Sequence, residues 1–85
     1  MNAINWHPKA LRQLRKLDAQ VNEQVRGAVT SELADMSTAR NVKALVKHEY
    51  GYRLRVGSYR VFFEFDGAVR VVSIEEVRKR DERTY

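Results

Sequence analysis

The sequence predicts an α+β fold, in which a short N-terminal strand and an antiparallel helical hairpin pack on a small antiparallel sheet in the order βααβββ. Two observations predict this class. Apolar residues recur at helical spacing in the first half of the chain, whereas they alternate with polar residues in the second half. Residues 1–85 are expected to form a single domain, because a chain of 85 residues buries one modest core.

The first half is predicted to hold a strand and two helices. The strand covers residues 2–6, and Pro8 suits the first turn of the helix that follows. The apolar side of this helix consists of Leu11, Leu14 and Leu17. Asp18 is expected to cap the second helix, which ends before a break at residues 37–41. The apolar side of the second helix consists of Val21, Val25, Ala28 or Val29, and Leu33 or Met36.

The second half is predicted to form a meander of strands with two-residue turns. Gly57-Ser58 predicts a type II′ hairpin, and Asp66-Gly67 predicts a type I′ hairpin. Residues that flank such turns pair with each other. The first turn gives the pairs Arg53–Phe62, Leu54–Val61, Arg55–Arg60 and Val56–Tyr59. The second turn gives the pairs Ser73–Arg60, Val71–Phe62 and Val72–Val61.

Alternation divides these strands into two faces. The apolar face, expected against the helices, carries Tyr52, Leu54, Val56, Tyr59, Val61, Phe63, Phe65, Val72 and Ile74. The other face carries Arg53, Arg55, Arg60, Phe62, Val71 and Ser73. Like charges directly opposite each other destabilise a sheet by up to about 1 kcal/mol. A bound anion removes that conflict, since guanidinium groups bind phosphate bidentately, and Phe62 offers a surface for a base. The paired arginines therefore predict an anion site.

The C-terminal segment "EEVRKRDERTY" adds cations and a phenol to this face. Arg78, Lys79 and Arg80 follow the last predicted strand, and the chain closes on Tyr85. A phenol beside several cations is a usable acid or base, because neighbouring positive charge favours the phenolate. Sheet and tail together can supply phosphate clamps and a proton-transfer group.

Composition excludes several other classes of site. The chain has no cysteine, and His7 and His48 lie far apart, so neither a metal site nor a cofactor is expected. The net charge of +5 and the pI near 9.9 favour a polyanionic partner. No signal peptide or apolar segment of membrane-spanning length is recognised, so a cytoplasmic protein without membrane contact is expected.

The segment "YGYRLRVGSYRVFFEFDG", followed by an apolar strand and a basic stretch that ends in Tyr, resembles the RelE/ParE superfamily of type II toxin–antitoxin toxins. The resemblance covers nearly the whole chain. RelE-like members enter the ribosomal A site and cut mRNA by attack of a ribose 2′-hydroxyl on the adjacent phosphate. The resemblance therefore implies a ribosome-dependent mRNA interferase, an endoribonuclease whose partners are the 30S A site, mRNA and a cognate antitoxin in a hetero-oligomer.

The resemblance also assigns roles to residues. Arg53 and Arg55 match the basic strand positions that contact the scissile phosphate, Arg60 matches the arginine that stabilises the transition state, and Tyr85 matches the tyrosine that meets the nucleotide. The expected catalytic residues are Arg53, Arg55, Arg60, Arg80 and Tyr85. The expected substrate-binding residues are Phe62, Ser73, Arg78 and Lys79. Arg78 or Lys79 can replace Arg80 in the catalytic set, because the spacing to Tyr85 leaves the alignment open.

The chain departs from RelE in its basic residues. Arg53 and Arg55 stand where RelE carries lysines, and no C-terminal His-Tyr pair is present. Arginine is effectively never deprotonated, which leaves electrostatic stabilisation as its role. Proton transfer then rests on Tyr85, on a ribosomal group or on water. Two alternatives stay open: a ParE-like inhibitor of DNA gyrase, and a non-catalytic relative that binds RNA or a partner protein.

Overall fold

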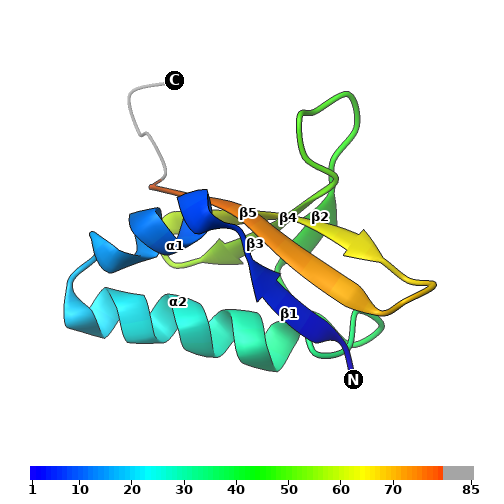
Figure 1. Ribbon diagram of the computed structural model, residues 1–85, viewed down its shortest axis with the longest axis horizontal. Helices are drawn as coiled ribbons and strands as arrows, with labels where there is room; N and C mark the ends of the chain where they lie inside the picture. The colour runs from blue at the N-terminus through cyan, green and yellow to red at the C-terminus, as the bar shows by residue number, and fades with distance from the viewer. Residues whose placement is uncertain (80–85) are drawn as a thin grey trace.

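The computed structural model describes residues 1–79 and has two helices on one face of a five-stranded sheet (Figure 1). The elements in chain order are β1 Ala3–Trp6, α1 Pro8–Arg15, α2 Ala19–Glu32, β2 Val42–Ala44, β3 Tyr52–Val56, β4 Tyr59–Asp66 and β5 Val71–Lys79. The α+β class expected from the sequence is confirmed.

The sheet differs from the expected one in two respects. Its order is β1-β5-β4-β3-β2, and β1 runs parallel to β5 at the edge, so the sheet is mixed rather than antiparallel. The short strand β2 extends the other edge by pairing with β3. Two of the residues in β2 are exposed, so this strand lacks the alternation by which a longer strand is recognised.

Both helices begin where the sequence predicts. Pro8 is the first residue of α1, and Nδ1 of the preceding His7 accepts a hydrogen bond from the Lys9 amide at 3.1 Å. Asp18 caps α2, since its Oδ1 accepts a bond from the Val21 amide at 3.0 Å. These side chains satisfy amides that a helix leaves unpaired at its start.

The core lies between the helices and one face of the sheet. The residues expected on that face are buried or packed against the core, and Val77 joins them. The helices contribute Ala10, Leu14, Val25, Val29 and Leu33. At the positions left open by the sequence, Val29 and Leu33 are fully buried, whereas Ala28 and Met36 are partly buried. Burial of each large aliphatic side chain stabilises the fold by about 1.5–3 kcal/mol.

The hairpin between β3 and β4 has the predicted register. The pairs Arg53–Phe62, Leu54–Val61, Arg55–Arg60 and Val56–Tyr59 are all present. Gly57 has φ of +55°, and Ser58 is not among the residues with positive φ. This combination is that of a type II′ turn, in which the first central residue needs the conformational freedom of glycine.

Gly57→Ala should lower the free energy of unfolding by about 1–2 kcal/mol, because alanine at this positive φ is strained whatever space surrounds it. Gly27→Ala is the matched control. Gly27 lies within α2 with open space around its Cα, so alanine there should raise the free energy of unfolding by about 0.5–1 kcal/mol. Urea denaturation of both variants measures the difference. Equal effects of the two changes would contradict the turn assignment.

The predicted register of the second hairpin is wrong. The turn contains residues 67–70, β4 continues to Asp66, and Asp66 pairs with Val71. The Asp66 side chain stabilises this longer turn, since Oδ1 accepts from the Ala68 amide at 2.9 Å and from the Val69 amide at 3.4 Å. An aspartate followed by glycine thus starts a longer loop here, because its carboxylate satisfies the loop amides.

A register shift on β5 moves the pairing further. Phe63 pairs with Ile74 but Phe62 pairs with Glu76, so Glu75 is an extra residue opposite β4. The expected pairs Ser73–Arg60, Val71–Phe62 and Val72–Val61 are therefore replaced by Arg78–Arg60, Glu76–Phe62 and Val77–Val61. The shift also explains why Ile74 and Val77 both reach the core, although a regular strand turns residues three apart to opposite faces.

Candidate anion-binding site

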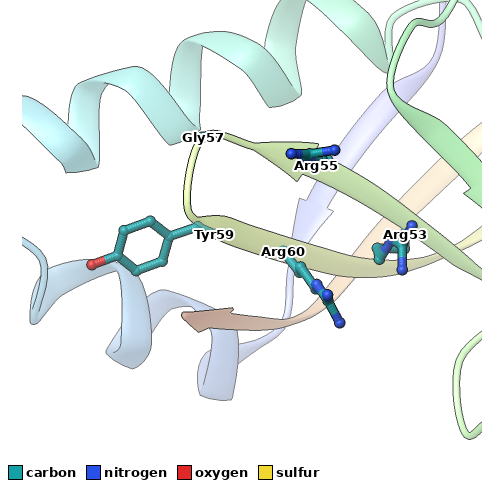
Figure 2. A pocket seen from close by; sticks show the side chains of 5 residues that line it. All are labelled: Arg53, Arg55, Gly57, Tyr59 and Arg60. Carbon is teal, nitrogen blue, oxygen red and sulfur yellow. The ribbon is translucent and has the colours of Figure 1, made fainter. Parts of the chain in front are cut away.

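A pocket of about 200 Å³ lies at the turn end of the β3–β4 hairpin (Figure 2). We call it the arginine pocket; its lining residues are Arg53, Arg55, Gly57, Tyr59 and Arg60. The predicted arginines of β3 and β4 are thus brought together. Figure 2 shows the ends of their side chains apart from one another, while the Tyr59 ring points away from them.

The arginine pocket is positively charged because the strand register places three arginines on one face of the sheet. Arg55 and Arg60 are directly paired, and Arg53 lies on the same face, two residues before Arg55. Within residues 1–79, no carboxylate forms an ion pair with any of these arginines. The buried Nε of Arg53 has no hydrogen-bond partner there. Unpaired guanidinium donors around a pocket favour an anion as the ligand.

Arg55→Glu should raise the free energy of unfolding by about 0.5–1 kcal/mol, because it replaces a like-charge pair with Arg60 by an opposite-charge pair. The same change should remove anion binding. Thermal denaturation measures the first effect, and Arg55→Gln separates loss of repulsion from gain of attraction. If Arg55→Glu destabilises the protein, the arginines are not held in conflict as the register implies.

Arg78 pairs with Arg60 in the ladder, but its guanidinium is bound by carboxylates. Its Nη2 lies 2.8 Å from Oε2 of Glu76 and 3.4 Å from Oε1 of Glu49. Lys9 of α1 places Nζ 3.2 Å from the other oxygen of Glu76. Glu76 is 5% exposed and lies opposite Phe62. Arg78 and Lys9 therefore compensate a buried carboxylate.

Hydrogen bonding controls the protonation of Glu76. Burial by itself raises the pKa of this carboxyl, but hydrogen bonds from Arg78, Tyr50 and Lys9 outweigh burial and lower the pKa to about 2. Burial and the bond to Glu76 raise the pKa of Tyr50 to about 12. The carboxylate is therefore ionised, and the phenol neutral, at physiological pH.

Phe62 does not offer the open surface that the sequence predicts. Its side chain is 4% exposed because three groups cover it. The ring of His48 stacks on it with centroids 5.3 Å apart, the Tyr50 ring lies at 5.5 Å, and the Arg78 guanidinium carbon lies 5.2 Å from its centroid. His48 and Tyr50 come from the loop 45–51, which projects from the sheet in Figure 1.

Of the remaining predicted residues, Ser73 and Lys79 do not line the arginine pocket described within residues 1–79. Ser73 pairs with Glu64 and is removed from Arg60 by the register of β5, so its predicted place beside Arg60 is wrong. Lys79 is exposed at the end of β5, opposite Tyr59. Arg80 and Tyr85 lie outside the described residues.

Sequence reasoning missed several contributors to this face. Glu76 was not predicted because its burial depends on the register shift in β5. His48 and Tyr50 lie just before β3, in the segment "HEYGY". The rings concentrated in this segment are the sequence signal that could have indicated an aromatic cluster.

The family comparison adds an independent finding. The profile described as "ParE toxin of type II toxin-antitoxin system, parDE" matches residues 4–84. The chain belongs to this ParE toxin family. It is thereby a toxin of the RelE/ParE superfamily of type II toxin–antitoxin systems, as the sequence resemblance implied. A comparison with curated proteins gave no match.

Solved structures with the same fold come from bacterial and archaeal toxin–antitoxin systems. A chain of the RelBE2 complex of Mycobacterium tuberculosis is 25% identical with a TM-score of 0.78, and the match covers 93% of this ParE-family toxin and 98% of that chain. Isolated RelE of E. coli is 21% identical with a TM-score of 0.78, covering 96% and 87%. The RelE–RelB complex of Pyrococcus horikoshii is 20% identical with a TM-score of 0.72, covering 95% and 97%. In the part of the toxin that the structure describes, no helix has the length and apolarity needed to cross a membrane.

Proposed function

We propose that this toxin is a ribosome-dependent mRNA interferase that cleaves mRNA in the ribosomal A site. The observation that carries the proposal is the arginine pocket, which Arg53, Arg55 and Arg60 line without a carboxylate partner among residues 1–79. Guanidinium groups in this arrangement suit a phosphate better than a neutral ligand. The sequence resemblance to RelE-like toxins favours an RNA phosphate as that ligand, and isolated RelE of E. coli shares the fold.

The proposed reaction is attack of a ribose 2′-hydroxyl on the adjacent phosphate, with departure of the 5′-oxygen of the next nucleotide. Negative charge grows on the phosphate oxygens as the new bond forms. Arg53, Arg55 and Arg60 would stabilise that charge, and fixed donors of this kind contribute most where charge develops. Because arginine stays protonated, proton transfer is assigned to Tyr85, to a ribosomal group or to water. Arg80 remains the proposed tail cation, with Arg78 and Lys79 as alternatives.

Arg78 is also a proposed phosphate ligand, but its present contacts impose a condition. Its guanidinium is held by Glu76 and Glu49, so it would have to exchange a carboxylate for a phosphate oxygen. The register supports this role, since Arg78 pairs with Arg60 and directly paired side chains lie on the same face of the sheet.

The proposed partner in the resting cell is a cognate antitoxin, in a hetero-oligomer located in the cytoplasm. Several of the solved structures with this fold are complexes of a RelE toxin with its RelB antitoxin. The net charge of +5 and the open arginine pocket suit an acidic antitoxin segment.

Inhibition of DNA gyrase is the second candidate, because the matching family profile is that of a ParE toxin. The two candidates use the protein differently. An interferase needs the arginine pocket for chemistry, whereas a gyrase inhibitor needs only a binding surface.

Primer extension in a purified translation system tests the proposal. The toxin is added to ribosomes that hold a defined mRNA with an empty A site, and in parallel to naked mRNA and to gyrase with relaxed plasmid. We expect cuts at A-site codons, none on naked mRNA, and normal supercoiling. Intact mRNA together with blocked supercoiling would replace the interferase by the gyrase inhibitor.

A further inference from the structure

An aromatic stack formed by His48, Tyr50 and Phe62 stands beside the arginine pocket. Phe62 is buried at its base, and His48 is exposed at its top. The His48 and Phe62 rings are nearly parallel, at an interplanar angle of 12°. Tyr50 flanks both rings at centroid distances of 6.0 and 5.5 Å. One ring of the stack is therefore presented to an external group.

The loop holds His48 in a defined orientation. Nδ1 of the imidazole accepts a hydrogen bond from the Tyr50 amide at 3.0 Å, which leaves Nε2 as the N–H donor in the neutral ring. The loop is closed by the bond from the Leu45 amide to the Gly51 carbonyl, and the Gly51 amide donates to Oε2 of Glu64 on β4. Tethers at both ends reduce the entropy lost when a ligand stacks on the ring.

The aromatic stack lies next to the arginines that line the arginine pocket. Phe62 pairs with Arg53 across the ladder, and directly paired side chains stand about 5 Å apart at Cβ. Arg60 lies two residues before Phe62 on the same face of β4. A group held by these arginines therefore lies next to the stack, and a nucleotide carries a phosphate and an aromatic base in the same close relation.

We propose that the exposed face of His48 is a base-binding subsite, which stacks an unpaired nucleobase of the codon whose phosphate occupies the arginine pocket. This inference rests on the proposed function and names the element that positions the RNA. Stacking on a ring tolerates any base and requires an unstacked strand, so the ligand is single-stranded RNA. His48 acts as a positioning residue and takes no part in the chemistry.

Single-turnover cleavage of short synthetic mRNAs on ribosomes tests the subsite. One mRNA is intact, and each of the others carries a ribose-abasic nucleotide at one position of the A-site codon, which keeps the phosphates and the 2′-hydroxyl. With subsaturating toxin, we expect His48→Ala to slow cleavage of the intact mRNA about tenfold. At one codon position, loss of the base should slow the wild-type toxin equally, and His48→Ala should then have no further effect.

Two variants control for the ring and for the loop. His48→Phe keeps a stacking surface and should cleave within about twofold of wild type, because stacking rather than the imidazole is required. Val46 belongs to the same loop, is 85% exposed and lies outside the stack. Val46→Ala should therefore leave the cleavage rate unchanged.

Two outcomes would overturn the subsite. The first is an unchanged rate for His48→Ala on intact mRNA; the second is an equal loss on intact mRNA and on every abasic mRNA. In both cases the wild-type toxin still cuts, so the proposed function stands. If the wild-type toxin cuts no mRNA, the proposed function fails, and the subsite fails with it.

Discussion

Arg60→Ala should abolish mRNA cleavage and growth arrest while the protein stays folded. Arg60 lines the arginine pocket and is expected to stabilise the charge of the transition state. Loss of one such donor typically slows a reaction by about 10²–10³-fold. The fold should tolerate the change, because Arg60 is half-buried and its removal ends the like-charge pairing with Arg55. Single-turnover cleavage and thermal denaturation measure the two effects.

The Arg60→Ala experiment needs a control variant that removes an arginine outside the arginine pocket. Arg40→Ala is suitable, since Arg40 is exposed in the segment before β2 and does not line the arginine pocket. It should remain fully toxic. Arg60→Lys should recover only part of the rate, because an ammonium cannot bind a phosphate bidentately. A fully toxic Arg60→Ala variant would contradict the interferase mechanism.

Glu76→Gln should lower the free energy of unfolding by about 2 kcal/mol at neutral pH. Glu76 is the acceptor shared by Arg78, Lys9 and Tyr50. It thereby links β5 to α1 through Lys9 and to the loop 45–51 through Tyr50. A pKa lowered from 4.5 to about 2 corresponds to about 3 kcal/mol. The Lys9 and Arg78 side chains are each 48% exposed, so solvent screens their attraction to Glu76. We therefore expect a stabilisation of about 2 kcal/mol rather than about 3 kcal/mol.

The same carboxylate should produce an acid-dependent loss of stability. The pKa of Glu76 is about 2 in the folded protein and near 4.5 in the unfolded chain, so above pH 4.5 both states are ionised and the stabilisation is complete. As the pH falls below 4.5, the unfolded state takes up the proton first, and the stabilisation disappears near pH 2. The difference between wild type and Glu76→Gln should therefore shrink from about 2 kcal/mol at pH 6 toward zero at pH 2.

Urea denaturation between pH 6 and pH 3 measures this difference, because carboxyl groups common to both proteins cancel. Glu75→Gln is the matched neighbour. Glu75 is only partly buried and takes part in no ion pair within residues 1–79, so its substitution should change stability by less than about 0.5 kcal/mol. A pH-independent difference for Glu76→Gln would show that the ion pairs contribute nothing and that packing alone accounts for the loss.

The local elements were predictable because their signals are local. Pro8 and Asp18 mark the helix starts, and Gly57 permits the turn that pairs Arg55 with Arg60. Since side chains alternate along a strand, this one turn was enough to place Arg53 on the same face. The charge conflict in the arginine pocket therefore followed from the sequence alone.

The rest of the site depends on distant contacts. The position of Arg78 opposite Arg60 depends on a longer turn after Asp66 and on the extra residue Glu75, and a strand's own alternation reveals neither. Burial of Phe62 depends on His48 and Tyr50 of the loop 45–51, whose rings lie against it. The sequence by itself determined which residues form the charged hairpin, because turn and strand preferences act between neighbours. Only the tertiary structure decided that His48 covers Phe62, that Lys9 reaches Glu76 and that Glu49 reaches Arg78, because those contacts join residues far apart in the sequence.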